Sequence, residues 1–480
     1  MVFSDLFFIF AFLPLFLGCY MLANVADRRW HAHSCRPTLF RNAVLVAFSL
    51  LFYAWGEPVY VFLMLGSVLV NFAAGRIIDG SDRHRKSALA VGLAANILIL
   101  GIFKYAGFVA QSLCAVGIPV AVPKIALPIG ISFYTFQSVS YLVDVYRREA
   151  PAQHRYSDLL LYISMFPQLI AGPIVRYDIV ALQIADRRIT RFDISEGIYR
   201  FFIGLGKKVI LANQFSTIAG QFLAGDLSRL STSGAWVGIL AFTMQIFFDF
   251  SGYSDMAIGL GRMLGFRFAE NFAHPYCCRT ITEFWRRWHI SLGSFFRDYV
   301  YIPMGGNRRH QPLNILTVWM LTGLWHGASW NFVLWGLYFG IIVMVEKYTV
   351  LKIANRVPSV FLRVYSLLLV VVGWGIFYFD DFGVMMRFFG AFTGNAPVLH
   401  DFTAESALMG NFWLWTAAVV MCMPVYDTIS GWFSRLFPYP TTLRKTIVLV
   451  TRLAVSMALL LLCTALLVGA TNNAFIYTRF

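Results

Sequence analysis

Charged side chains are scarce in this chain, making up only 13% of its 480 residues. Soluble domains usually contain about 25% charged residues. Hydrophobic residues reach 59%, and the mean hydropathy is +0.66. These values exclude an ordinary soluble domain. They indicate an all-α, multi-pass membrane protein, because an apolar helix satisfies its own backbone hydrogen bonds in lipid.

Acidic residues are scarcer than basic ones, with 24 Asp and Glu against 39 Lys and Arg, a net charge of +15. A basic balance also occurs in nucleic-acid-binding proteins, but here the basic residues are spread among short loops between apolar runs. We therefore expect membrane lipid as the surroundings and no nucleic-acid partner. The loop at 27–41 holds four arginines and one aspartate, which predicts a cytoplasmic loop and a periplasmic N-terminus.

Several common motifs are missing. The seven cysteines form no CxxC pair, so we expect neither a disulfide framework nor a zinc site. The glycines at 204–206 and 259–265 lack the strand and spacing of a nucleotide-binding loop, and we interpret them as close-packing positions. No internal repeat is visible, which disfavours an inverted-repeat transporter. Residues 1–22 lack the basic start of a signal peptide and are expected to be a retained span.

Apolar runs predict membrane helices along the whole chain. Within 156–174, Pro167 and Pro173 predict a re-entrant or kinked segment that protein must cover. The charged residues of 192–222 predict a helix along the membrane surface. The other expected spans are 42–55, 59–75, 87–110, 125–143, 233–264, 360–379, 411–425 and 447–469.

Three charged residues fall inside the expected spans. Lys104 has a long stem that is expected to snorkel toward the membrane interface. Asp255 and Arg262 are seven positions apart and share a helix face, which predicts a structural ion pair or a polar site of the inner cavity.

One long stretch, residues 313–345, contains no Asp, Glu, Lys or Arg and includes His326. It is long enough to cross a bilayer, although Gly323 and Gly327 interrupt it near the middle. An ionisable side chain in hydrocarbon is unfavourable by a few kcal/mol unless it is paired or faces water. His326 is therefore either a functional residue at membrane depth or a neutral structural histidine bonded to a backbone carbonyl.

A second histidine lies in a polar and aromatic segment before this stretch. Thr280 and Glu283 predict a capping box, and apolar residues then recur at three- and four-residue intervals, which predicts one amphipathic helix ending near 303. His289 lies on its apolar stripe and should point inward, whereas Arg287 lies on the opposite side. The alternative is an interfacial aromatic helix with a buried structural histidine.

Two inward histidines on neighbouring segments suit either a proton relay or acyl transfer, since imidazole can act as a general base near neutral pH. Neither has a third metal ligand at helical spacing, so we expect no metal. For acyl transfer to a hydroxyl, His326 is the expected base, and backbone amides near Gly327 are expected to stabilise the oxyanion.

Several motifs resemble the membrane-bound O-acyltransferase family, and most closely its bacterial alginate O-acetyltransferase branch. They are Trp288-His289, DYVYIP at 298–303, GGNR at 305–308, LWHGASWNF at 324–332, FPQLIAGPIVRY at 166–177, the segment 248–266 and the two ends, 1–22 and 475–480. The resemblance implies one membrane-embedded domain, 1–480. It also implies roughly 11–13 membrane helices, including re-entrant and interfacial ones, around a central funnel and tunnel.

The same resemblance implies site residues and a reaction. His326 falls on the family's near-invariant histidine and His289 on its second polar position; Trp325, Asn331 and Trp288 are assigned to substrate binding. The implied activity is an acetyl relay across the bacterial inner membrane, from a cytoplasmic thioester to an exported, alginate-like polysaccharide. Acetyl-CoA is the expected donor, without a tightly bound cofactor, and a periplasmic acetyltransferase is the expected partner. The alternatives are a D-alanyl or other acyl relay to a cell-wall polymer and, in another class, a transporter or proton channel.

Overall fold

The computed structural model describes residues 2–30, 37–170, 172–436, 442–470 and 475. Within these ranges the chain is helical and has no strand, apart from one isolated bridge between Phe272 and Trp288. Eight of the described helices are long and apolar enough to cross a membrane, so the predicted all-α, polytopic class is confirmed. Parts of three predictions lie outside the described residues: 31–36 of the basic loop, Ala171 of the 166–177 motif, and 476–480.

The described chain divides into two compact units. The first consists of Met1–Phe202 and Tyr253–Ala269, and the second of Ile203–Gly252 and Glu270–Phe480. Helices α10 (Arg191–Gly206) and α12 (Thr232–Met263) continue from one unit into the other. The single domain expected over 1–480 stays a prediction.

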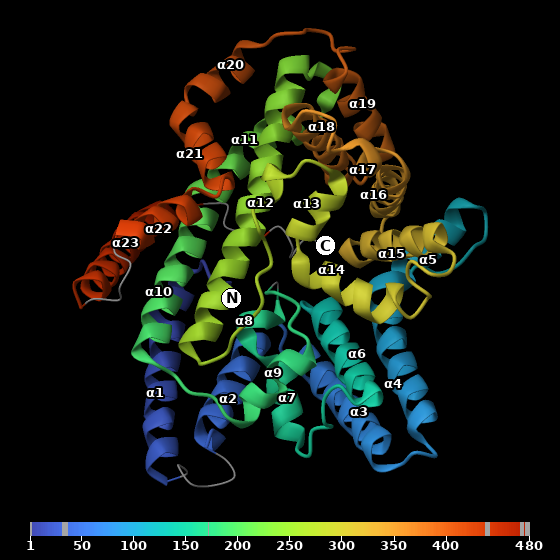
Figure 1. The fold of residues 1–480 in the computed structure, drawn as a ribbon. Helices are drawn as coiled ribbons and strands as arrows, with labels where there is room; N and C mark the ends of the chain where they lie inside the picture. The colour runs from blue at the N-terminus through green and yellow to red at the C-terminus, as the bar shows by residue number, and fades with distance from the viewer. Residues whose placement is uncertain (1, 31–36, 171, 437–441, 471–474, 476–480) are drawn as a thin grey trace. The chain divides into compact units, whose positions relative to one another are not determined.

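The first unit is a bundle in which α1 packs on α2, and α3 on α4, with α6 against both α3 and α4 (Figure 1). Buried Asn71 of α3 and Asn96 of α4 donate side-chain hydrogen bonds to each other, which satisfies both amides inside apolar helices. The elements of this unit before α10 are η1 (Phe8–Phe12), α1 (Leu13–Trp30), α2 (Leu39–Gly56), α3 (Tyr60–Gly80), α4 (Arg85–Leu100), η2 (Gly101–Tyr105), α5 (Ala106–Ala115), α6 (Ile131–Arg147), α7 (Tyr156–Ser164), α8 (Phe166–Leu169) and α9 (Tyr177–Ala185).

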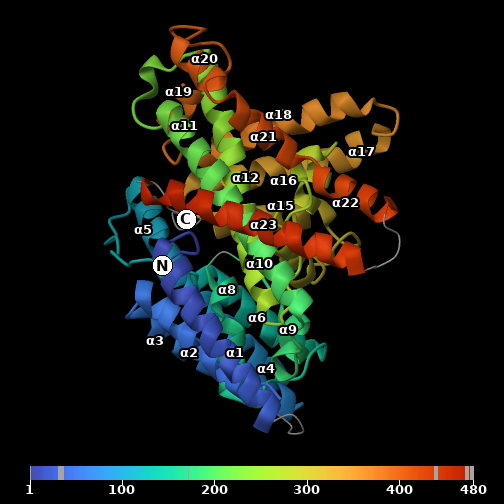
Figure 2. The ribbon, with the colours of Figure 1, turned by 90° about the vertical axis from the view of Figure 1, so that its left-hand side faces the viewer.

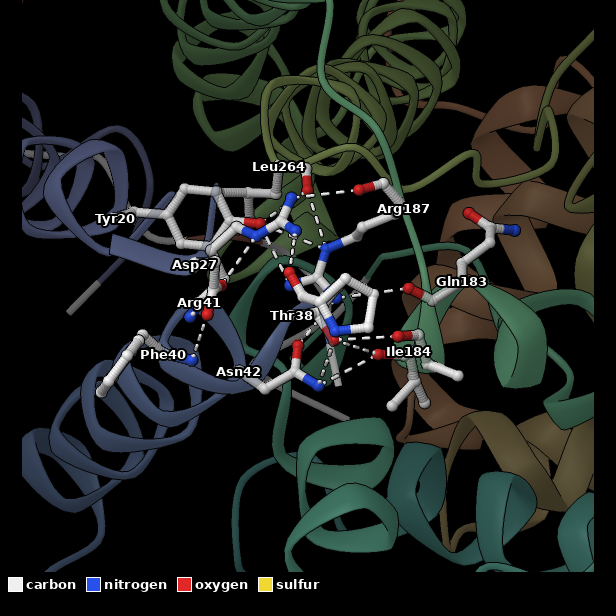
Figure 3. Close-up of polar contacts among 12 residues, drawn as sticks. Tyr20, Asp27, Thr38, Phe40, Arg41, Asn42, Gln183, Ile184, Arg187 and Leu264 are labelled. Atoms are coloured by element: carbon white, nitrogen blue, oxygen red, sulfur yellow. Dashed lines mark hydrogen bonds and ion pairs between the residues drawn. The ribbon is translucent and has the colours of Figure 1, made fainter. Parts of the chain in front are cut away.

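A buried polar cluster ties four elements of the first unit together (Figure 3). Asp27 of α1 accepts the backbone N–H of Arg41 at 3.1 Å and pairs with the Arg41 guanidinium at 3.0 Å, at the start of α2. Arg187, which follows α9, donates to the Tyr20 hydroxyl and, at 3.1 Å, to the carbonyl of Leu264 after α12. Asp27 and Arg41, assigned to a basic loop from the sequence, are thus buried structural residues.

The break expected around Pro167 is present and covered by protein. Helix α7 ends at Ser164, and the four residues of α8, Phe166–Leu169, are all buried. The Phe166 N–H donates to the Ser49 hydroxyl at 3.1 Å, and the Gln168 amide donates to the Tyr162 carbonyl. Re-entry of this segment into a membrane stays a prediction.

Several charges of the helical segment 192–222 pair with α12, and the location of this segment along a membrane surface stays a prediction. In the first unit Arg200 of α10 pairs with Asp255 at 2.9 Å, and Glu196 pairs with Arg262 at 3.0 Å. Asp255 and Arg262 therefore do form structural ion pairs, but with α10 and not with each other. Salt bridges between helices replace the pairing expected within one helix face.

Two lysines are buried. Lys208 lies 2.7 Å from Asp249 in the second unit, and the oppositely charged partner compensates for the lost hydration of both groups. Lys104, in the first unit, donates to the Ser132 hydroxyl at 3.2 Å. The expected snorkelling of Lys104 is therefore wrong.

The close-packing role predicted for the two glycine-rich stretches is confirmed. A Cβ on Gly259 would lie 2.6 Å from the Gly197 carbonyl oxygen in the first unit. In the second unit a Cβ on Gly252 would lie 2.7 Å from the carbonyl oxygen of Gly204, which belongs to the first stretch. Helices α10 and α12 thus approach each other at backbone distance.

The second unit contains the elements that carry both candidate histidines. Its last helix, α23, is unbroken over 27 residues (Figure 2). The remaining elements are η3 (Lys207–Ala212), α11 (Asn213–Leu223), η4 (Leu227–Arg229), η5 (Pro275–Cys277), α13 (Ile281–Arg287), α14 (Ile290–Phe296), η6 (Arg297–Tyr301), α15 (Gln311–His326), α16 (Trp330–Tyr348), α17 (Val350–Ile353), α18 (Ser359–Tyr378), α19 (Phe382–Phe392), α20 (Phe402–Met409), α21 (Phe412–Cys422), α22 (Val425–Leu436) and α23 (Thr442–Val468).

Candidate active site

The uncharged stretch forms two packed helices, not the single interrupted span expected from the sequence. Helix α15 ends at His326, and α16 begins at Trp330. The two helices approach closely because glycine has no side chain. A Cβ on Gly323 would lie 2.1 Å from the Phe332 carbonyl oxygen, and one on Gly336 would lie 2.3 Å from the Trp319 carbonyl oxygen. Because backbone atoms cannot move aside as a side-chain tip can, glycine is required at both positions.

His326 closes α15 and lies in an aromatic environment. Its side chain is buried, with 5% of the residue exposed. The imidazole centroid is 4.8 Å from the Trp325 ring, 5.1 Å from Trp335 and 5.3 Å from Phe377, each in an edge-on arrangement. The bulk of these rings restricts the orientations open to the imidazole of His326.

The segment that carries His289 is broken, which corrects the prediction of one continuous amphipathic helix. Helix α13 ends at Arg287 and α14 begins at Ile290, and Figure 1 shows them as separate short helices. His289 occupies the break with φ +46°, a left-handed conformation that non-glycine residues seldom adopt. The predicted cap is present, since the Thr280 side chain accepts the Glu283 N–H at 3.1 Å. The Glu283 carboxylate, however, accepts the N–H of Arg279 instead of that of Thr280.

The imidazole of His289 points inward, as the sequence predicted, and has a defined hydrogen-bond partner. Only 2% of the residue is exposed, and Nδ1 lies 3.1 Å from Asn271 Oδ1. The N–H and hydroxyl of Ser291 donate to the same oxygen. Because that oxygen is an acceptor, Nδ1 carries the proton and Nε2 carries the lone pair. Nε2 is buried and has no hydrogen-bond partner among the described residues.

Burial keeps His289 neutral. The residue lies outside the candidate spans, and loss of hydration lowers the pKa of its imidazole to about 3. At pH 5 to 8 the ring is therefore uncharged, and its Nε2 can accept a proton or a hydrogen bond.

The indole of Trp325 lies between the two histidines. Its ring centroid is 5.5 Å from that of His289 and 4.8 Å from that of His326. The second unit thus brings Trp325, His289 and His326 into one buried group, although these residues come from two helix pairs. Trp288 lies instead against an aromatic core, with ring centroids 5.0 Å from Trp374 and 5.1 Å from Phe272.

Asn331 and the Gly327 amide, two groups with predicted roles in the site, have hydrogen-bond partners within the protein. Asn331, 1% exposed, donates from its side chain to the carbonyl of Phe377 at 3.2 Å, which fixes the start of α16 to the end of α18. The Gly327 N–H donates to the Gly323 carbonyl at 3.4 Å. The buried indole N–H of Trp335, whose ring is 5.1 Å from that of His326, has no hydrogen-bond partner among the described residues. Substrate binding by Asn331, Trp325 and Trp288 stays a prediction.

Sequence reasoning missed two residues that fix this geometry, Asn271 and Glu346. Asn271 opens the polar segment, 18 positions before His289, and no helical spacing links the two. Glu346 is the acid that ends the uncharged stretch, and that position was its available signal. Among the described residues no group of three His, Cys, Asp or Glu side chains could hold a metal ion.

The chain was also compared with known proteins by sequence. The model of the MBOAT, membrane-bound O-acyltransferase family, matches residues 50–388, which include both histidines. The chain belongs to this family. It is 42% identical over 402 residues to a protein of Azotobacter vinelandii described as the probable alginate O-acetylase AlgI, covering 82% of this chain and 78% of that protein. The family and these relatives establish it as an O-acyltransferase.

Related proteins act on different polymers by their printed names. The chain is 35% identical over 381 residues to a peptidoglycan O-acetyltransferase of Helicobacter pylori, covering 72% of this chain and 70% of that protein. It is 28% identical over 229 residues to a teichoic acid D-alanyltransferase of Bacillus subtilis, covering 45% of this chain and 58% of that protein. The printed names of these relatives share acyl transfer and differ in the polymer.

Proposed function

We infer that this enzyme carries acetyl groups from a cytoplasmic thioester across the inner membrane for O-acetylation of an exported, alginate-like polysaccharide. The observation that carries the proposal is the buried group of His289, Trp325 and His326, in a chain 42% identical to the alginate O-acetylases. Acetyl-CoA is the proposed donor. A periplasmic acetyltransferase that receives the acetyl group and passes it to the polymer is the proposed partner.

In the proposed reaction His326 acts as the general base. Its imidazole takes the proton of the attacking hydroxyl as the C–O bond forms, and the C–S bond of the thioester then breaks. The leaving sulfur receives that proton back from the imidazolium, so the histidine is regenerated. The indole N–H of Trp335 is the proposed donor to the negative charge that develops on the carbonyl oxygen.

His289 has a different proposed role. Its neutral Nε2 can accept a hydrogen bond from another O–H or N–H group of the acyl donor or the acceptor and so orient that molecule, while Nδ1 stays bound to Asn271. Burial lowers the pKa of this imidazole, which makes it a weak base and a stable acceptor. Trp325, in contact with both imidazoles, is placed to separate them and to pack against the acetyl group.

The test compares O-acetylation of the cell's exported polymers with and without this protein. Loss of polymer-bound acetate on deletion, restored by the wild-type chain, supports the proposal. In inverted membrane vesicles acetyl-CoA should support transfer, whereas a D-alanyl carrier thioester should not. Transfer from the D-alanyl donor alone would point to the teichoic-acid activity instead. Ion flux in liposomes that needs no acyl donor would favour a transporter.

The proposed topology, with a periplasmic N-terminus, has a separate test. A cysteine introduced by Arg36→Cys, with Cys35 replaced by serine, should be protected from a membrane-impermeant thiol reagent in intact spheroplasts. A cysteine introduced by Val59→Cys, at an exposed position next to the turn at 56–58, should be labelled. Labelling of position 36 and protection of position 59 would invert the proposed orientation.

A further inference from the structure

Glu346 is a buried acid that binds a helix from another part of the second unit. It is fully buried in the last turns of α16, where the negative end of the helix dipole disfavours a carboxylate. Its oxygens accept the backbone N–H groups of Ile281 and Thr282 and the Thr282 hydroxyl, each at 2.7 Å. Such charge-assisted bonds are stronger than neutral ones.

These bonds complete the start of α13. The first N–H groups of a helix have no partner within it. In α13 the Thr280 side chain accepts the third of them, from Glu283, and Glu346 accepts the first two. A helix of seven residues is too short to be stable alone, so these contacts decide where it lies.

The far end of α13 leads directly to His289. The side-chain oxygen of Asn271 is hydrogen-bonded to the His289 imidazole, and the backbone carbonyl of Asn271 accepts the N–H of Ile290 at 3.0 Å. Glu346 therefore fixes one end of the segment and Asn271 the other. Because Glu346 belongs to α16, which packs on α15 through Gly323 and Gly336, it also links the His289 segment to the helix that ends at His326.

We propose that Glu346 is a positioning residue that sets the location of His289 relative to His326 by tying α16 to the start of α13. The proposal rests on the function proposed above for the two histidines. It concerns a carboxylate that touches neither ring, and it predicts that loss of the tie changes the rate of the chemical step more than it changes donor binding.

The first measurement is acetyl transfer from acetyl-CoA in inverted membrane vesicles at matched protein levels. In Glu346→Gln an amide –NH2 replaces one acceptor oxygen, so it faces either the N–H of Ile281 or the N–H and hydroxyl of Thr282. A misplacement of about 1 Å can lower a rate about 100-fold, so kcat should fall about 10- to 100-fold while KM for acetyl-CoA changes less than about threefold. Thr282→Val, which removes a single hydroxyl, should give a smaller loss.

The matched control is Asp401→Asn. Asp401 also accepts a backbone N–H at a helix start, that of Thr403 at 2.6 Å, but α20 carries no site residue. This variant should keep the wild-type kcat. An equal loss of kcat in Glu346→Gln and Asp401→Asn would overturn the proposal, because the effect would then be one of general stability.

Hydrogen exchange of the full chain in detergent gives a readout that is independent of activity. In Glu346→Gln the amides of 281–289 should exchange at least about tenfold faster, while those of α15 stay as in the wild type. Unchanged protection of 281–289, or a wild-type kcat, would overturn the positioning role. A wild-type chain that transfers no acetyl group would instead contradict the proposed function, and the exchange data would still decide whether Glu346 positions α13.

Discussion

The two histidine segments of the second unit are built in opposite ways. His326 ends a helix in a hairpin that is closed by glycine contacts, and aromatic rings surround its imidazole. His289 lies in a break between two short helices and is held by a hydrogen bond to Asn271. The His326 ring is packed among aromatic side chains, whereas the His289 ring is hydrogen-bonded to Asn271.

This difference indicates which substitutions each segment tolerates. A packed segment fails when volume is added, whereas a polar network fails when a partner is removed and a buried group loses its hydrogen bond. It also separates the proposed roles, because the hydrogen bond to Asn271 fixes the tautomer of His289, whereas His326 is the proposed base. The variants below test the contrast in order of decreasing expected effect.

The largest effect is expected at His326. His326→Gln keeps a side chain that can hydrogen-bond but cannot take a proton at neutral pH, so acetyl transfer should fall at least about 100-fold, within the range of about 10²–10⁴-fold for general-base catalysis. Membrane insertion should be unchanged, because a bundle of apolar helices does not depend on one imidazole. The measurement is polymer O-acetylation at matched membrane levels of the protein. His326→Ala is the companion variant, and substantial acetylation by His326→Gln would leave only a packing role for this histidine.

The next effect is expected at the hairpin. In Gly336→Ala the new Cβ would lie 2.3 Å from the Trp319 carbonyl oxygen, so α15 and α16 must separate. Overpacking of this kind destabilises by about 1–3 kcal/mol, and the yield of folded protein should fall about tenfold. Gly390→Ala is the control, since nothing lies within 4 Å of the corresponding position in α19. Equal yields, measured by size-exclusion chromatography in detergent, would show that the hairpin is not closely packed.

The sequence predicted the inward face of His289 and the Thr280 cap because both follow from helical spacing. It did not predict the break, since nothing in the local sequence requires a left-handed histidine at 289. The tie to Asn271 is a tertiary contact across 18 residues and leaves no periodic signal. The glycines near His326 were recognised as interruptions. Only the contact of Gly323 with the Phe332 carbonyl, together with that of Gly336 with the Trp319 carbonyl, shows that the two helices form a closed hairpin.

The ion pairs between helices are also tertiary contacts, and the sequence does not indicate which charged residues pair. Composition correctly predicted a membrane protein, but it could not assign partners to individual charges. Arg200 and Lys208 were placed on a membrane surface because their helix alternates apolar and charged residues. The structure pairs them with Asp255 and Asp249 of α12, on a helix more than 40 positions away.

A smaller effect is expected when the polar network is cut. Asn271→Ala removes the acceptor of the His289 Nδ1–H, so the ring loses its orientation and acetyl transfer should fall about tenfold. Asn271→Asp keeps an acceptor oxygen and should retain more activity at pH 8. The control is Asn314→Ala, which removes another buried amide, one that binds the carbonyl of Gly306. A tenfold loss in that variant as well would mean that any buried amide has the same effect.

The aspartate variant also makes a prediction about pH. In the wild type the pKa of His289 is about 3, so this residue causes no loss of activity between pH 8 and pH 5. A carboxylate beside the imidazole favours the protonated form and raises its pKa. As the pH falls through the raised value, Nε2 gains a proton and can no longer accept a hydrogen bond. The ratio of Asn271→Asp to wild-type activity should therefore fall with decreasing pH, and a constant ratio would contradict the acceptor role of Nε2.

The smallest effect is expected at Arg287, two positions before His289 and on the other side of α13. Its guanidinium is partly exposed and pairs with Glu283 at 2.6 Å, an i,i+4 contact of a kind that contributes roughly 0.3–0.5 kcal/mol. Arg287→Gln keeps the backbone carbonyl that accepts the Ala273 N–H, so the break and the position of His289 should persist. Acetyl transfer should therefore fall less than about threefold, whereas His289→Ala should fall about tenfold or more at the same protein level. Equal losses in the two variants would place the charged side of α13 in the active site and reverse the inward face assigned to His289.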